Sequence, residues 1–414
     1  MQAIETLERL TRSQPFASPS LLSAVLADAV ADMPTGGEQH IALLLPLTGP
    51  YAEIGWKIVH GVNAAQWELT AGGSRAAIHV INTEAADWSS RLASLPASCR
   101  VVGGPLRTQS YSHAKQSGAL AGRALFSFTQ RLDAGDEGIA AWRFFGSPED
   151  QSAALLDFAA AQGATVYGIL HPDDSYGLRM TEIFSNAVLQ RGFAVHKKVS
   201  YPLGRHEEWT RRVRDYLSVR MIEKDPIPAA GFQATFLPDN WMNSEMLVPN
   251  LFFYNEEKQI LLATNLWEQD LSARQRVDAR NFGLAVFPSA WDPELSSPAA
   301  VNLNLMLADA GLPEPDYWAA LGYDFVRFAI YLNLSQESLD VSAINMKLSQ
   351  ALDFNWSAAP LRWNSQGIVS QDFRLFTPSA TGYRAVNPEQ FTRRLEQARS
   401  RQEQRLEMIS AKKR

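Results

Sequence analysis

From about residue 40, short apolar runs of strand length take turns along the chain with segments in which apolar residues recur at helical spacing. Residues 41–45 are a short apolar run with the length of a strand buried on both faces. The polar loop Pro46-Leu47-Thr48-Gly49-Pro50 follows, and apolar residues then recur at helical spacing over residues 56–69. Repetition of strand, loop and helix predicts an α/β fold with parallel sheets.

Two successive runs of such units are separated at residues 144–148, where Ser147 and Pro148 are typical of a helix start. The first run predicts strands at residues 41–45, 77–82, 100–103 and 125–128 and helices at 56–69, 88–95 and 110–120. The second predicts strands at 165–170, 194–200, 234–236 and 259–264 and helices at 149–162, 179–191 and 207–224.

The pattern changes after a strand that begins at residue 285. Helices are predicted at residues 300–310, 318–332 and 341–352. A hairpin of residues 360–363 and 373–377 and a charged helix from 388 to about 410 are expected to end the fold. Residues 1–37 have helical spacing interrupted by Pro15, Pro19 and Pro34, which predicts a short helical preface and a linker.

Charge is distributed unevenly along the 414 residues. Residues 390–414 contain eight Lys or Arg and three Glu, so with the whole chain at −6 the remainder carries −11. An acidic body argues against nucleic acid as a partner. The longest apolar runs are too short to span a membrane, and the first residues do not resemble a signal peptide. The chain is therefore either cytoplasmic or lacks its export signal.

Local catalytic motifs are absent from the sequence. There is no GxxxxGK[ST], GxGxxG, HExxH, CxxC or GxSxG, and the seven His are scattered. Asp173-Asp174 is more typical of a helix-entry loop than of a metal pair. Cys99, the single cysteine, lies at the start of an apolar run and is expected to be a buried small hydrophobe. These observations predict a non-enzymatic protein with no cofactor and no metal.

An ordered set of motifs resembles the type I periplasmic solute-binding proteins, the leucine/isoleucine/valine receptor group. The set includes residues 46–50, 101–105, 171–177 and 320–324, and it covers about residues 38–386. The resemblance implies two doubly wound parallel-sheet lobes joined by three crossovers, with a ligand between them. Lobe one would be residues 38–143 plus 288–359, lobe two 144–287 plus 360–386, and residues 387–414 would form a charged C-terminal helix.

Three segments look closest to one branch of this superfamily, the penicillin-binding-protein activators. They are residues 43–47, 144–151 and 236–239. The activators are outer-membrane lipoproteins with a helical part before this fold, and the helical preface is consistent with that. The resemblance therefore implies a periplasmic or outer-membrane-anchored bacterial protein whose export signal is missing from this chain.

The resemblance also assigns ligand-binding positions. Asn265 stands where the amino-acid receptors have an acidic residue that pairs with the ligand ammonium group. Arg107 and Arg131 would add positive charge, so a free α-amino acid fits poorly. For Trp241 and Trp267, a place in the core or between the lobes is favoured over stacking on a ligand. The full candidate set is Thr48, Tyr51, Arg107, Thr108, Ser127, Thr129, Arg131, Tyr176, Asn240, Trp241 and Asn265.

Two functions follow from these features. The first is an exported binding protein that closes on a small molecule for ABC transport or sensing, with a transporter permease as partner. The second is a protein–protein regulator of a cell-wall synthase, a peptidoglycan-synthesising enzyme, with a modified or vestigial cleft. A cytoplasmic sensor related to transcription regulators is disfavoured because no basic helix-turn-helix precedes the core.

Overall fold

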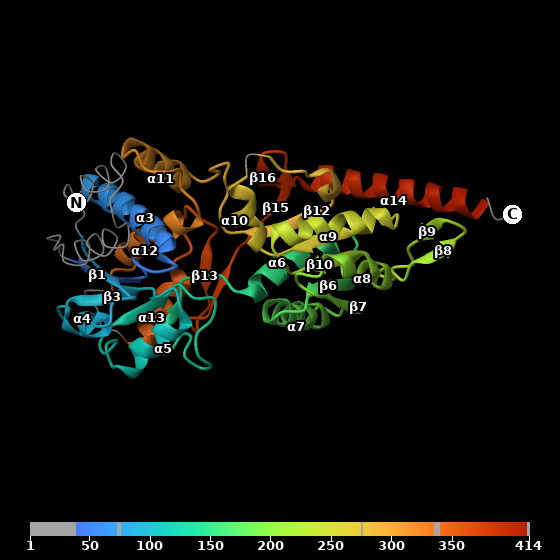
Figure 1. Cartoon of the computed structure of the whole chain (residues 1–414). Coiled ribbons are helices and arrows are strands. Elements are labelled where there is room, and N and C mark those ends of the chain that lie inside the picture. Colours follow the sequence, from blue (N-terminus) through green and yellow to red (C-terminus); the bar gives the residue numbers. More distant parts are fainter. Residues whose placement is uncertain (1–38, 73–75, 275, 335–339, 412–414) are drawn as a thin grey trace, which may run out of the picture. The chain divides into compact units, whose positions relative to one another are not determined.

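The computed structural model describes residues 39–72, 76–274, 276–334 and 340–411 (Figure 1). The chain forms two compact units, which divide it at residues 147/148, 294/295 and 372/373. Three divisions agree in number with the predicted crossovers. The helical preface predicted at residues 1–37 lies outside the described residues.

The first unit contains a five-stranded sheet in the order β2-β1-β3-β4-β5, in which all pairs are parallel. Residues 41–45 are fully buried in β1, as their apolar run predicted. The strands are β1 (Gln39–Leu45), β2 (Ala76–Asn82), β3 (Cys99–Gly103), β4 (Ala124–Ser127) and β5 (Trp142–Arg143). The helices are α3 (Ala52–Ala71), α4 (Trp88–Ser94), α5 (Thr108–Gln116), α11 (Pro298–Asp309), α12 (Tyr317–Leu332) and α13 (Val341–Gln350).

The second unit contains a seven-stranded sheet in the order β16-β15-β12-β11-β10-β6-β7. Strand β15 pairs antiparallel with both β12 and β16, and all other neighbouring strands of this sheet pair parallel. The sheet strands are β6 (Val166–Pro172), β7 (Ala194–Tyr201), β10 (Ala234–Leu237), β11 (Ile260–Ala263), β12 (Ala285–Ser289), β15 (Arg374–Ser379) and β16 (Gly382–Ala385). The α-helices are α6 (Pro148–Ala161), α7 (Ser175–Gln190), α8 (Trp209–Tyr216), α9 (Trp241–Phe253), α10 (Leu266–Ser272) and α14 (Pro388–Ala411), and Arg280–Phe282 forms the short 3-10 helix η2.

Two elements of the second unit differ from the prediction. The helix predicted at residues 207–224 ends with α8 at Tyr216, because Ser218 has a positive φ of 51° and the chain then turns into the hairpin β8 (Arg220–Ile222) and β9 (Asp225–Ile227). Helix α9 was not predicted at all. It is apolar on both its buried and its exposed positions and contains Pro249, so it lacks the amphipathic pattern of a surface helix.

The predicted C-terminal hairpin was wrong in its second strand. Strand β13 (Leu361–Trp363) pairs with β14 (Val369–Gln371), whereas β15 pairs with β12 and β16. The β13–β14 hairpin belongs to the first unit because Arg143 donates a hydrogen bond to the carbonyl of Val369 at 3.0 Å and Phe144 packs on Trp363. The third division of the chain therefore falls at residues 372/373 instead of the predicted 359/360.

Candidate functional site

The loop after β1 is fastened to the carboxyl end of β2. The Asn82 side chain accepts a hydrogen bond from the Leu47 amide at 2.9 Å and donates one to the Thr48 hydroxyl at 3.0 Å. Thr48 is half-buried, and Tyr51, which directly precedes α3, is exposed. Carboxyl ends of parallel strands are where ligands bind in open α/β sheets. Two of the predicted residues therefore lie at the expected edge of the first unit.

The ion pair between Arg107 and Glu84 lies at the same edge of the first unit. Arg107 forms an ion pair with Glu84 at 3.2 Å, and its guanidinium lies 5.6 Å from the centre of the Tyr51 ring. The sequence predicted that Arg107 would add positive charge to the cleft, and the ion pair with Glu84 compensates that charge. Glu84 was missed, although its position just after a predicted buried strand was a usable signal. Thr108 is half-buried as the first residue of α5.

The two candidate hydroxyl groups at the carboxyl end of β4 form hydrogen bonds within their own loop. Ser127 Oγ and Thr129 Oγ1 are 2.8 Å apart, and the Thr129 hydroxyl donates to the Arg131 carbonyl, also at 2.8 Å. Ser127 and Thr129 are buried, and Arg131 is exposed. These bonds satisfy buried hydroxyls locally, so their first role is to hold the loop.

Tyr176 in α7 bonds to the end of a neighbouring strand. Its hydroxyl donates to Thr264 Oγ1 at 3.0 Å, and Thr264 is fully buried just after β11. Burial raises the pKa of Tyr176 to about 12. The neutral hydroxyl is therefore a permanent hydrogen-bond donor at neutral pH.

A buried carboxylate that the sequence reasoning missed follows β10. Asp239 accepts a hydrogen bond from the Tyr201 hydroxyl at 2.6 Å and one from the backbone N–H of Asn240 at 2.7 Å. The side-chain amide of Asn243 donates to both carboxylate oxygens at 3.0 Å. Burial raises the pKa of Asp239 above its ordinary value. Its position directly after a predicted buried strand was the available signal, whereas its pairing with Tyr201 was not visible in the sequence.

Two of the three remaining candidates, Asn240 and Trp241, have side chains that are used locally. The Asn240 side chain accepts a hydrogen bond from the backbone N–H of Asn243 at 2.9 Å and so caps α9. Trp241 is fully buried, with its ring 5.0 Å from Trp267 and 4.4 Å from Phe282. Trp241 is therefore a core residue, as the favoured interpretation had it, and it leaves the set of candidate ligand-binding residues. Asn265 is half-buried, and its backbone amide donates to Gln151 at 3.3 Å.

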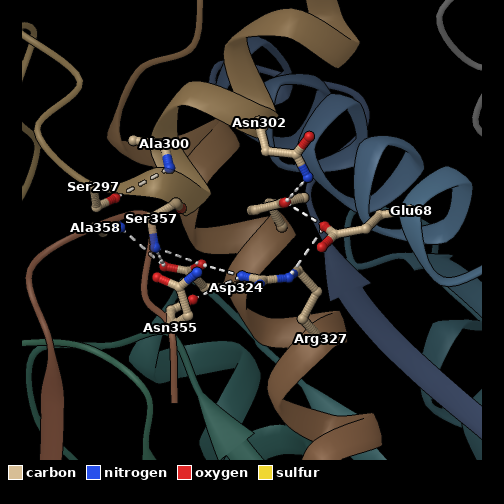
Figure 2. A network of polar contacts seen from close by, with 10 residues as sticks. Glu68, Ser297, Ala300, Asn302, Asp324, Arg327, Asn355, Ser357 and Ala358 are labelled. Carbon is tan, nitrogen blue, oxygen red and sulfur yellow. Dashed lines mark hydrogen bonds and ion pairs between the residues drawn. The ribbon is translucent and has the colours of Figure 1, made fainter. Parts of the chain in front are cut away.

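A second buried polar network holds helix α12 in the first unit (Figure 2). Asp324 is fully buried and accepts the backbone amides of Ser357 at 2.9 and 3.0 Å and of Ala358 at 3.0 Å. Figure 2 shows Arg327 between Asp324 and Glu68, with ion-pair distances of 3.4 and 3.2 Å. Burial raises the pKa of Asp324 to about 6. This network fastens the chain after α13 to α12.

The described residues offer hydrogen-bonding groups and aromatic faces at the strand ends. Among them, no group of three or more His, Cys, Asp or Glu could hold a metal ion. Burial raises the pKa of the Cys99 thiol to about 11, as suits the buried hydrophobe that the sequence predicted. Over the same residues, no helix has both the length and the apolar character needed to cross a membrane.

Sequence comparison places the chain near one family of lipoproteins. A family model described as "LppC putative lipoprotein" matches residues 18–225. The penicillin-binding protein activator LpoA of Photobacterium profundum is 28% identical over 169 residues, which are 40% of this chain. The match spans 26% of that relative, so only about a quarter of its length is compared.

Structural comparison gives the fold. The C-domain of LpoA from Haemophilus influenzae, a regulator of PBP1A, has a TM-score of 0.61 and 15% identity over 84% of this chain and 100% of that one. An ABC transporter substrate-binding protein from Desulfitobacterium hafniense in complex with Leu has a TM-score of 0.62 and 17% identity over 84% and 99%. These likenesses confirm the predicted type I periplasmic binding protein fold.

Proposed function

The chain belongs to the LppC lipoprotein family, and from that membership we propose that it binds and activates a penicillin-binding protein in the bacterial envelope. The relative named above is an activator of that class, and the H. influenzae domain of the same fold is a regulator of PBP1A. The protein would act from the outer membrane as a lipoprotein and would perform no chemistry itself.

The observation that carries this proposal over simple ligand binding is the match to the LppC family. The geometry of the strand ends adds to it. Arg107 is paired with Glu84, the Ser127 and Thr129 hydroxyls bond to each other, and Asn240 caps a helix. Polar groups that are already hydrogen-bonded gain little from a ligand, because their bonds must first be broken.

The proposal is tested by mixing the purified protein with purified penicillin-binding proteins of the same organism. We expect one of them to bind, measured by biolayer interferometry, and to synthesise peptidoglycan faster from a labelled lipid-linked precursor. A heat-denatured sample is the control for non-specific effects. Absence of both binding and rate change with every penicillin-binding protein of the organism would overturn the proposal.

Small-molecule binding is the second candidate function. It is favoured by the likeness to a substrate-binding protein in complex with Leu and by Tyr51 and Tyr176, whose rings are exposed and half-buried at the strand ends. Native mass spectrometry of the purified protein, followed by thermal-shift assays with amino acids, sugars and peptidoglycan fragments, decides this function. A clean mass and an unchanged midpoint across the panel would exclude it.

A further inference from the structure

Helix α14 separates its charges around its circumference. Successive residues of an α-helix are about 100° apart, so Arg394, Arg401 and Arg405 lie within about 40° of one another. The glutamates of the helix all lie at least about 140° from Arg394. They are Glu389, Glu396, Glu403 and Glu407. One face of α14 is therefore basic, and the helix itself places no carboxylate beside that face.

The basic face of α14 borders a hollow of about 170 Å³ in the second unit, which we call the α14 hollow. Arg394, Gln397 and Arg401 of α14 line it, together with Arg280 and Asn281 of η2 and with buried leucines of α9 and the sheet. One water needs roughly 10–15 Å³, and sites for drug-sized ligands have roughly 300–1,000 Å³. The α14 hollow therefore has the size for a small ligand.

The α14 hollow lies at the edge of the sheet opposite to the strand-end candidates. Gln259 and Leu284 line it, and they directly precede the parallel strands β11 and β12. Tyr176, by contrast, bonds to Thr264 after the carboxyl end of β11. Parallel strands have their amino ends at one edge and their carboxyl ends at the other, so the two places are distinct.

Two arginines of the α14 hollow lack a counter-charge. Within the described part of the chain, no carboxylate forms an ion pair with Arg394 or Arg401. Arg405 of the same helix, by contrast, pairs with Glu257 at 2.5 Å. Arg394 is half-buried. Removing a cation from water without a compensating anion is costly, so a bound anion would be favoured here.

The carboxylates that line the α14 hollow already have partners. Glu257 is paired with Arg405. Glu256 is 2% exposed and accepts a hydrogen bond from the backbone N–H of Lys258 at 3.3 Å and one from the side chain of Gln402 at 3.5 Å. These carboxylates are therefore not available to neutralise Arg394 and Arg401.

The balance of charge around the α14 hollow is positive. Arg280 pairs with Asp278 at 2.6 Å. A smaller hollow that shares Gly283 and Arg394 adds the exposed Arg384. The charged residues that line the two hollows, with their ion-pair partners, are five arginines and three acids, a net charge of +2. They are Arg280, Arg384, Arg394, Arg401 and Arg405 against Glu256, Glu257 and Asp278. This site is positive within a protein whose net charge is −6.

We propose that the α14 hollow binds a small multivalent oxyanion, a phosphate ester or a polycarboxylate. Guanidinium groups bind phosphate and carboxylate oxygens through paired, charge-assisted hydrogen bonds, and the amides of Asn281 and Gln397 offer further donors. Two uncompensated cations match a ligand with at least two negative charges. Seven residues of helix rise about 10 Å between Arg394 and Arg401, so the two side chains can reach one small ligand from both ends. This site does not depend on the proposed function.

Isothermal titration calorimetry of the full chain with pyrophosphate and with citrate tests the proposal. At a fixed ionic strength of about 0.15 M, we expect saturable binding of at least one of them and at least tenfold weaker binding of acetate. Tighter binding of pyrophosphate would assign the site to phosphate esters, and tighter binding of citrate to polycarboxylates. Absence of binding by both anions would overturn the inference.

Substitution of the two uncompensated arginines locates the site. R394Q/R401Q should weaken anion binding at least tenfold. The matched control is R211Q/R393Q, which removes two exposed arginines of the same unit outside the hollow and makes the same change of net charge. The control should leave the affinity unchanged. Equal losses in the two variants would mean that overall charge attracts the anion, and would overturn the inference.

Thermal denaturation separates anion binding from a structural role of these arginines. Without anion, R394Q/R401Q should unfold at a temperature no lower than the wild type, because no ion pair is lost. Saturating pyrophosphate or citrate should raise the midpoint of the wild type and leave that of the variant unchanged. A variant that unfolds well below the wild type without anion would show that the arginines already stabilise the fold, and would overturn the inference.

Gly283→Glu tests the same site while every arginine is retained. A β-carbon on Gly283 meets no atom within 4 Å, and φ is −63°, so the backbone admits a side chain there. The new carboxylate would compete with the ligand for Arg394 and should weaken binding at least tenfold, whereas the uncharged Gly283→Gln should weaken it less. Binding by Gly283→Glu as tight as by the wild type would place the anion elsewhere and overturn the inference.

Discussion

Gly61 in α3 lies directly against the backbone of Ala319 in α12. A β-carbon placed on Gly61 would stand 1.8 Å from the Ala319 carbonyl oxygen, well inside van der Waals contact. The relationship is reciprocal one turn away, where a β-carbon on Gly322 would stand 2.2 Å from the Ile58 carbonyl oxygen. Two helices far apart in the sequence therefore touch through their backbones, and glycine at both positions makes this possible.

Gly61→Ala is expected to lower the free energy of unfolding by at least about 2 kcal/mol, because the two helices must separate to admit a methyl group. Chemical denaturation followed by circular dichroism measures the change. Gly283→Ala is the matched control, since a β-carbon there meets no atom within 4 Å and φ is −63°. Equal effects of the two substitutions would contradict the close approach.

Asp324 is expected to make stability depend on pH. Its pKa in the folded protein is about 6, above the ordinary value of 3.8. Between these values the folded state holds a proton that the unfolded state has lost, so stability falls as pH rises from about 4 to about 6. Two pKa units correspond to about 3 kcal/mol.

Urea denaturation at pH values from 4 to 7 measures this slope. Asp324→Asn should be less stable than the wild type, because an amide cannot accept every hydrogen bond that the carboxylate accepts, but its slope should be shallower. Asp239 and Glu256, whose pKa values are also raised by burial, contribute in the same direction and remain in the variant. An identical slope in both proteins would show that Asp324 does not titrate in this range.

Helix α14 packs into the core of the second unit, whereas its sequence predicted a separate charged helix. Phe391, Leu395 and Ala398 are buried with residues of α6 and the sheet. Leu395→Ala should therefore cost about 2–5 kcal/mol of stability. Met408→Ala, which shortens an exposed side chain of the same helix, should change little. Equal thermal midpoints for the two variants would mean that α14 does not stabilise the unit.

Sequence patterns predicted those parts of the fold in which local signals agree. The apolar run at residues 41–45 became the centre of β1, and Cys99 is buried as expected. Helix α9 was missed because a helix that is apolar on two faces lacks the period on which the prediction depends. The strand partner of β13 was wrong because pairing is decided by contacts with distant segments, here Arg143 and Phe144.

The candidate site was predictable only as a set of loops. Thr48 and Tyr51 in the first unit and Tyr176 in the second lie at strand ends, because parallel topology places the loops that follow the strands at one edge of each sheet. What each side chain contacts was not predictable: Arg107 meets Glu84 from another loop, and Trp241 points into the core. These contacts join segments more than 20 residues apart, and the spacing of residue types along the chain does not predict such contacts.

Tyr201 is expected to stabilise the second unit through Asp239. The phenol donates a hydrogen bond of 2.6 Å to a carboxylate that is buried with it, so Tyr201→Phe removes one donor from a charged acceptor that water cannot easily reach. Loss of such a bond costs about 1.5–3 kcal/mol. Tyr176→Phe removes only a hydroxyl–hydroxyl bond to Thr264 and should cost less, about 1 kcal/mol.

Because burial raises the pKa of Asp239, the cost of Tyr201→Phe should shrink at acid pH, where the carboxyl becomes protonated. Thermal denaturation of both variants at pH 4 and pH 7.5 measures this difference, and a pH-independent cost would mean that Asp239 does not change its protonation state between these values.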